Sequence, residues 1–250
     1  FSNYLKKSPI PLIGSHRGIS DTISKHQENT IESIFSIQNN KANYAEVDIM
    51  FTKDNHLILF HDDSIDSNQI EKTDFKTLLN LKPNLITLDE LMQINIKQEK
   101  TLLLNIELKS YFLSYDQKKK CIDILLTKLN QLDLTYKVLI SSFDQELLKF
   151  VSEKNTSFLI ALLFEKSENF NINASLLPKL SALCPHFNAI QDAQRYKLPN
   201  FVWETGLESH ILTKTQDLLS TSSFFNWIQS MNIYGLTTNH VSKIRSLLTS

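Results

Sequence analysis

Short apolar runs alternate with amphipathic stretches along most of this 250-residue chain. The apolar runs predict strands at residues 10–15, 44–50, 102–108, 137–142, 158–164, 187–191, 201–205 and 233–238. Between them, apolar residues spaced three and four apart predict helices, among them 29–39, 86–95, 117–131, 144–154 and 216–230. Strands that alternate with helices in this way favour a (β/α)₈ TIM barrel, with residues 1–250 as a single domain. A doubly wound open sheet is the alternative.

The second predicted strand carries charge on one of its faces. Within "YAEVDIMFTKDNHLILFHDD", residues 44–63, apolar residues alternate with Glu46 and Asp48, so the two carboxylates share a face. A turn at residues 53–55 then predicts a hairpin over 51–61 that extends the strand and ends at His61. Residues 62–85 are expected to form a small insertion before the next barrel helix.

The third predicted strand repeats this pattern. In "LLLNIELKS", residues 102–110, Asn105, Glu107 and Lys109 lie on one face and leucine and isoleucine on the other. Buried charges must be paired, ligated or placed at a wet mouth, because an unpaired one costs many kcal/mol in principle. Glu46, Asp48 and Glu107 therefore predict a site for one hard divalent cation, Mg²⁺ or Ca²⁺. The alternative is a set of salt bridges at the strand rim, such as Glu107 with Lys109.

Two histidines end apolar strands that point at these carboxylates. The first strand ends in "IGSHRG", which places His16 and Arg17 at the carboxyl end of the barrel, where His61 also arrives. Two histidines beside a metal and basic groups suit acid–base cleavage of a phosphodiester. Arg17 and Lys109 would then hold the phosphate oxygens, Arg17 through its planar fork and Lys109 as a point charge.

Composition narrows the range of partners. The formal net charge is −1, from 26 basic and 27 acidic residues, so no basic excess indicates nucleic acid or an anionic membrane surface. There is no apolar run of about 18 residues, which excludes a membrane-spanning helix. Cys121 and Cys184 make neither a disulfide framework nor a metal motif, and Cys121 is expected to be a buried core thiol. The cysteine usage leans towards cytoplasm, but the chain begins with Phe1, so removal of a signal leaves a periplasmic or secreted location open.

A series of motifs in fixed order resembles the glycerophosphodiester phosphodiesterase family. They are "HRG" at 16–18, "ENT" at 28–30, "EVD" at 46–48, "HDD" at 61–63, "NIELK" at 105–109 and "SSFD" at 141–144. The segments "FVWET" at 201–205 and "YGLTTN" at 234–239 are similar to the closing segments of the family. The resemblance extends from about residue 10 to residue 245.

This resemblance implies a metal-dependent TIM-barrel hydrolase that cleaves glycerophosphodiesters to glycerol 3-phosphate and an alcohol. By position, the residues resemble the family's metal ligands (Glu46, Asp48, Glu107), its acid–base pair (His16, His61) and its phosphate-contacting residues (Arg17, Lys109). Trp203 matches an aromatic position that packs against the glycerol or head group, with a core tryptophan as the alternative. Asn29, in the "ENT" motif, is expected to cap the following helix.

The chain also departs from the family pattern in both of its closing segments. Trp203-Glu204-Thr205-Gly206 stands where the family usually has Trp-Thr-Val-Asn, and Thr237-Thr238-Asn239 where it usually has Ile-Thr-Asp. Neither departure removes a proposed catalytic group. Both alter the rim and wall of the pocket, so the chemistry is better defined than the substrate.

Two other functions remain as alternatives. A phospholipase D-like enzyme of the same fold would act on phospholipids and expose an aromatic loop to peripheral lipid contact. The segment "SYFLSYD", residues 110–116, offers such a surface, although the start of a helix core is the preferred interpretation. A non-catalytic binding module would be expected to have lost at least one of the proposed site residues, and none is missing.

Overall fold

The computed structural model describes residues 11–19, 27–154, 157–166, 170–203 and 221–249. Within these ranges the main sheet consists of β1 (Leu12–Ser15), β2 (Tyr44–Phe51), β3 (Leu57–Leu59), β6 (Leu103–Leu108), β7 (Val138–Ser142), β8 (Leu159–Phe164), β9 (Ala182–Pro185), β10 (Asn200–Trp203) and β11 (Ile233–Thr238). A separate ribbon pairs β4 (Ser64–Ile65) with β5 (Asn68–Gln69). The helices are α1 (Ile31–Asn40), α2 (Phe75–Leu81), α3 (Leu88–Asn95), α4 (Tyr115–Gln131), α5 (Gln145–Glu153), α6 (Ile190–Ala193), α8 (Thr221–Ser230) and α9 (Val241–Thr249).

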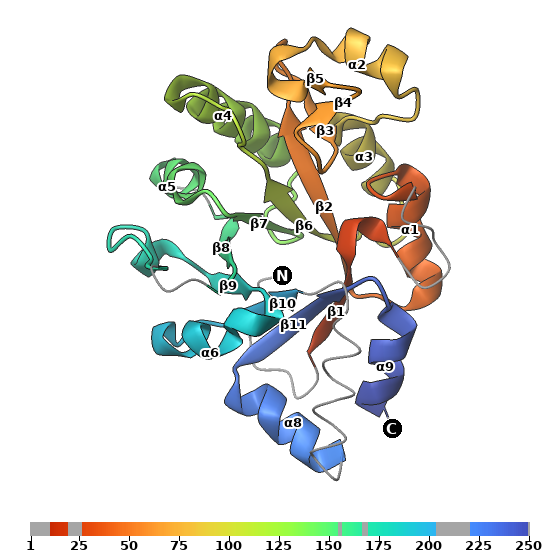
Figure 1. Ribbon diagram of the computed structural model, residues 1–250. Helices are drawn as coiled ribbons and strands as arrows, with labels where there is room; N and C mark the ends of the chain where they lie inside the picture. Colours follow the sequence, from red (N-terminus) through yellow and green to blue (C-terminus); the bar gives the residue numbers. More distant parts are fainter. Residues whose placement is uncertain (1–10, 20–26, 155–156, 167–169, 204–220, 250) are drawn as a thin grey trace.

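The main sheet closes on itself. Parallel pairing runs from β2 through β6, β7, β8, β9, β10 and β11 to β1, and β1 also pairs with β2, so the strands form a closed ring with helices outside it (Figure 1). This confirms the predicted (β/α)₈ barrel. The predicted hairpin is also present, because β3 runs antiparallel to β2 with Ile49 opposite Leu59.

One predicted strand is wrong. The strand expected at 187–191 is a 3₁₀ turn, Phe187–Ala189, followed by the short helix α6, and the barrel strand at this place is β9. Phe187 packs beside Trp227 on the outside of the barrel, and Ile190 is buried in the same cluster. A short apolar run does not distinguish a strand from a buried helical turn. The predictions for residues 10, 204–205 and 216–220 fall outside the described residues.

The alternation along β2 assigns its two faces to different environments. Val47 and Ile49 belong to the large cluster between barrel and helices, whereas Tyr44 belongs to the interior cluster with residues such as Phe201. Gly14 makes room for the Tyr44 ring, because a Cβ there would lie 2.2 Å from it. The interior face of β2 therefore begins with a buried aromatic side chain. Farther along the strand, the same face can present polar side chains to the barrel mouth.

The insertion over 62–85 packs on the hairpin at one end of the barrel (Figure 1). It contains β4, β5, a 3₁₀ turn at Ile70–Lys72 and α2, and its small core includes Ile58 from β3, Ile70 and Leu78. Cys121 is buried on α4, as expected. No helix in the part of the chain that the structure describes is long and apolar enough to cross a membrane.

Candidate active site

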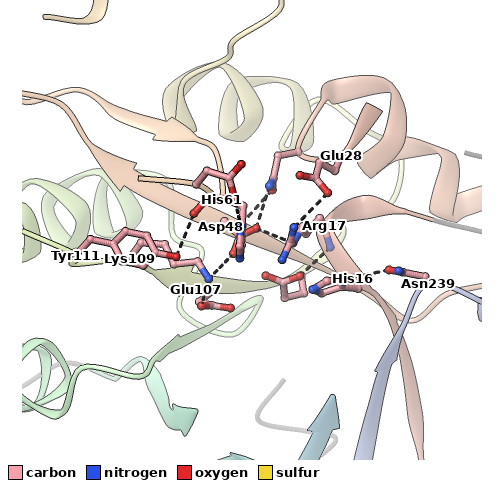
Figure 2. A network of polar contacts seen from close by, with 12 residues as sticks. His16, Arg17, Glu28, Asp48, His61, Glu107, Lys109, Tyr111 and Asn239 are labelled. Carbon is pink, nitrogen blue, oxygen red and sulfur yellow. Dashed lines mark hydrogen bonds and ion pairs between the residues drawn. The ribbon is translucent and has the colours of Figure 1, made fainter. Parts of the chain in front are cut away.

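Most of the side chains singled out in the sequence line one pocket at the carboxyl ends of the strands, and Asp48 is buried in contact with Arg17 and Lys109. A cavity of about 450 Å³ is lined by His16, Arg17, Glu46, His61, Glu107, Lys109 and Trp203, together with Tyr111, Phe143 and others. The residues come from separate strand ends, β1, β2, β3, β6 and β10, and meet because the barrel closes. Figure 2 shows the polar contacts that connect most of them.

Three buried carboxylates form the base of this network. In the parallel β2–β6 pair, Asp48 lies opposite Glu107, and Glu46 lies two residues earlier on the same face. Each offers an oxygen atom within 4.8 Å of the others. One oxygen of Glu46, Oε1, is buried with no hydrogen-bond partner among the described residues. The three carboxylates could together hold a metal ion through oxygen atoms.

Two cations already lie beside these carboxylates. The Lys109 ammonium is 3.0 Å from Oδ1 of Asp48 and also pairs with Glu107, while Arg17 Nε is 3.3 Å from Oδ2 of Asp48. Arg17 adopts a left-handed backbone conformation, with φ of 53°, that directs its own N–H to Oε2 of Glu46 at 2.7 Å. The predicted cluster and the predicted Glu107–Lys109 salt bridge are therefore both present, and they share the same carboxylates.

Burial and mutual repulsion separate the pKa values of the three acids. Burial, with the charges of Asp48 and Glu107, raises the pKa of Glu46 well above its ordinary value. Burial also raises the pKa of Glu107, to about 7, although Lys109 opposes this. Burial would raise the pKa of Asp48 too, but Lys109 and Arg17 outweigh it and hold that pKa below its ordinary value. Ionising all three acids at neutral pH therefore requires more positive charge than the two side chains supply.

His16 is held in one tautomer. Its Nδ1 lies 2.9 Å from Oδ1 of Asn239 at the end of β11. An amide oxygen only accepts, so Nδ1 carries the proton and Nε2 keeps its lone pair. Burial, followed by the positive charge of Arg17, lowers the pKa of His16 to about 4. The imidazole is therefore neutral at pH 7.

His61 is oriented by the chain around it. Its Nδ1 lies 2.7 Å from Oδ1 of Asp62, so the Nδ1–H donates to a carboxylate and Nε2 is left for other partners. The Tyr111 hydroxyl donates to the His61 carbonyl at 3.4 Å, from the loop after β6 (Figure 2). His61 thus belongs both to the hairpin and to a contact with the neighbouring strand end.

Comparison with known families decides the identity of this site. The model of the glycerophosphoryl diester phosphodiesterase family matches residues 16–243, most of the chain. The chain belongs to this family. Membership makes it a phosphodiester hydrolase, and it accounts for the motif order seen in the sequence.

The chain is similar to other phosphodiesterases in sequence and in fold. A glycerophosphodiester phosphodiesterase of Caldanaerobacter subterraneus subsp. tengcongensis is 27% identical over 173 residues, which cover 62% of this chain and 67% of the relative. The crystal structure of a glycerophosphodiester phosphodiesterase from Parabacteroides distasonis matches with a TM-score of 0.75 at 18% identity, covering 96% of this chain and 97% of the other. An Oleispira antarctica phosphodiesterase in complex with its product sn-glycerol-3-phosphate matches with a TM-score of 0.70 at 19% identity, covering 96% and 98%.

The role expected for Asn29 in the "ENT" motif is wrong. Thr30 caps α1 instead, in a reciprocal capping box with Ser33. The Asn29 side chain donates from Nδ2 to Oδ2 of Asp48 at 2.9 Å and accepts the Asp48 N–H at 3.0 Å. Asn29 therefore orients a proposed metal ligand. Sequence reasoning missed this because Asn and Thr are adjacent and both are good capping residues.

Asn239, at a position where the resemblance leads us to expect Asp, contacts His16. This departure from the family pattern therefore lies in the site. Glu204 and Gly206 lie outside the described residues. Trp203 is half-buried, donates from Nε1 to the Cys184 carbonyl at 3.1 Å and meets Phe143 edge to face, so it is both wall and packing residue.

The sequence favoured the start of a helix core for the segment 110–116, but most of this segment is not helical. Helix α4 begins at Tyr115, and residues 110–114 form a loop in which Leu113 is buried. Tyr111 and Phe112 are exposed by 48% and 52%. The loop therefore presents aromatic surface beside the pocket.

Proposed function

We propose that the pocket hydrolyses glycerophosphodiesters to glycerol 3-phosphate and an alcohol in a metal-dependent reaction with histidine acid–base catalysis. The observation that carries this proposal is the buried group of Glu46, Asp48 and Glu107, of which Glu46 and Glu107 line the same pocket as His16 and His61. Family membership supplies the reaction class. The bound product in the Oleispira antarctica structure supports the same substrate class.

The three carboxylates fit one hard divalent cation, Mg²⁺ or Ca²⁺. All donors are oxygen atoms, and Oε1 of Glu46 has no hydrogen-bond partner among the described residues, which leaves a lone pair for a ligand. A cation would favour the ionised form of Glu46 and Glu107, whose pKa values are raised without one. When bound, such a cation would supply Lewis-acid polarisation of a phosphoryl oxygen.

The two histidines would divide the proton transfers. His16 is neutral, and its Nε2 lone pair accepts a proton from the water molecule that attacks phosphorus. His61, whose Nδ1 is held by Asp62, donates a proton from Nε2 to the oxygen of the departing alcohol. One bond from phosphorus to oxygen forms and another breaks, and the alcohol leaves neutral.

The remaining residues would bind the substrate. Arg17 and Lys109 contact the phosphate oxygens and stabilise the charge that develops on them. Both now pair with Asp48, so they are held beside the pocket before substrate arrives. Trp203, which makes a T-shaped contact with Phe143, packs against the glycerol or head group.

A substrate panel with metal control tests this proposal. Purified protein is stripped with chelator and assayed on glycerophospho-choline, -ethanolamine and -inositol, each without metal, with Mg²⁺ and with Ca²⁺. We expect glycerol 3-phosphate only when a divalent metal is restored. Full activity in protein shown by elemental analysis to lack divalent metal would refute the metal-dependent mechanism.

Lysophospholipids belong in the same panel, because Tyr111 and Phe112 are exposed beside the pocket. A liposome-binding assay accompanies them. Cleavage of lysophospholipids with liposome binding, and none of the water-soluble esters, would replace the proposed substrate class by the phospholipase D-like alternative.

A further inference from the structure

Three successive residues after Lys109 are each fixed by a different part of the chain. Ser110 donates from Oγ to Oδ2 of Asp144 at 2.6 Å, and Tyr111 donates to the carbonyl of His61 at 3.4 Å. Phe112 donates its backbone N–H to Oε2 of Glu71 at 2.7 Å. Ser110 and Tyr111 both line the pocket, so this loop is one of its walls.

Glu71 lies in the insertion, on the 3₁₀ turn Ile70–Lys72, and only 4% of it is exposed. Its other oxygen, Oε1, is buried without a hydrogen-bond partner among the described residues. The next residue, Lys72, places its ammonium 5.9 Å from the centre of the Phe112 ring. Two consecutive residues of the insertion therefore hold Phe112 from the backbone and from the ring.

Burial of the Glu71 carboxylate does not by itself stabilise the fold. A carboxylate buried with a single N–H donor loses more hydration than one hydrogen bond returns. The insertion already has an apolar core, to which Ile70 contributes beside Glu71. The Glu71 carboxylate instead connects that core to the loop that forms the pocket wall, a connection that no apolar side chain could make to a backbone N–H.

We propose that Glu71 is a positioning residue, which fixes the Ser110–Phe112 wall of the pocket and through it the binding of the phosphodiester substrate. The inference rests on the proposed function, because it takes this pocket as the substrate site. Glu71 touches no substrate itself. It acts through the Phe112 N–H, and the insertion thereby takes part in substrate binding.

The test compares Glu71→Ala, Glu71→Asp and Glu71→Gln with the unchanged protein on the best ester of the panel. Alanine removes the acceptor, aspartate shortens it, and glutamine keeps an oxygen at the same reach. Because binding to the wall is made in ground state and transition state alike, loss of the contact raises KM more than it lowers kcat. We expect KM to rise up to about 10-fold for alanine and aspartate, the effect of losing one hydrogen bond. Glutamine should restore most of the affinity.

Glu90→Ala is the control for loss of a glutamate acceptor outside the pocket. Glu90 also accepts a backbone N–H at 2.7 Å, from Thr87, but in the capping box of α3 outside the pocket. The Glu90→Ala substitution should lower the melting temperature and leave KM unchanged. If Glu71→Ala and Glu71→Asp behave in the same way as Glu90→Ala, Glu71 is only structural and the proposal is wrong.

Hydrogen exchange at the Phe112 amide separates this proposal from the proposed function. The amide should exchange faster in Glu71→Ala and Glu71→Asp, and at the unchanged rate in Glu71→Gln. Accelerated exchange in a protein that cleaves no ester would refute the proposed function and leave the loop contact established. An unchanged exchange rate in both Glu71→Ala and Glu71→Asp would refute the positioning role.

Discussion

Nδ1 of His16 donates a hydrogen bond to Oδ1 of Asn239, over a distance of 2.9 Å and a sequence separation of 223 residues. The contact crosses the seam of the barrel, where β1 pairs with β11 and Ser15 lies opposite Thr238. It decides which nitrogen of His16 carries the proton. Burial, with the charge of Arg17, lowers the pKa of this histidine to about 4, and Asp48 and the Asn239 amide oppose that shift only in part.

Asn239→Asp should shift the pH dependence of catalysis. A carboxylate at this position favours the protonated imidazole, so the pKa of His16 rises from about 4. If His16 is the base, its active form is then lost at a higher pH, and the acidic limb of the kcat profile moves upward. Stopped assays over the acidic range measure this. An acidic limb that stays in place in Asn239→Asp would show that His16 is not the base.

His16→Ala and His61→Ala should each lower kcat by about 10²- to 10⁴-fold, the range for loss of a general acid or base. The double variant should be little worse than the more impaired single variant, because groups that act as a unit are strongly non-additive. Steady-state rates of the four proteins, with circular dichroism to verify folding, complete the cycle. Losses that simply add as free energies would contradict a cooperating pair.

Metal should stabilise the protein through Glu46. A cation that binds only the native state adds about 2.7 kcal/mol at a hundred times its Kd. Glu46→Gln removes a buried acid whose pKa is raised by burial and by Asp48 and Glu107, so in chelator it should melt above the unchanged protein. It should gain little on adding Mg²⁺ or Ca²⁺. Thermal denaturation across a metal titration tests both points.

Asp48→Asn should behave differently from Glu46→Gln. The sequence alone makes this substitution mild, because it preserves shape and lowers repulsion. In the structure Asp48 pairs with Lys109 and Arg17, so its loss leaves two buried cations undercompensated. We expect destabilisation of about 3–5 kcal/mol, the usual cost of breaking a buried ion pair. Denaturant unfolding in chelator measures it, and an Asp48→Asn protein as stable as Glu46→Gln would contradict the ion-pair network.

Glu71 should make stability depend on pH. Burial raises its pKa from 4.5 to about 7 in the folded protein, against the N–H of Phe112, with Asp63 raising it further and Lys72 and Lys118 opposing. The folded state therefore binds this proton more tightly than the unfolded state. The stability that this provides is present below about pH 4.5 and is lost as the pH rises through about 7. Glu71→Gln does not titrate, so its stability relative to the unchanged protein should increase over that interval, as urea unfolding at a series of pH values would reveal.

Local patterns in the sequence were sufficient for the barrel and for most of its strands. Period-two alternation on β2 and β6 is a property of neighbouring residues, and it placed Glu46, Asp48 and Glu107 on interior faces. His16, Arg17 and His61 were placed at the barrel mouth because each follows an apolar strand. The strand predicted at 187–191 failed, because the three apolar residues of this segment pack equally well in a helical turn against an outer helix.

The sequence by itself determined which residues gather at the mouth of the barrel, since strand direction and side-chain alternation are local. Only the tertiary structure decided how they pair. Closure of the barrel joins Asn239 to His16, and the Asn29 side chain contacts Asp48 instead of capping a helix. The insertion similarly brings Glu71 to Phe112. Such pairings depend on long-range closure, and no local periodicity encodes them, because each joins side chains from elements that meet only when the barrel is complete.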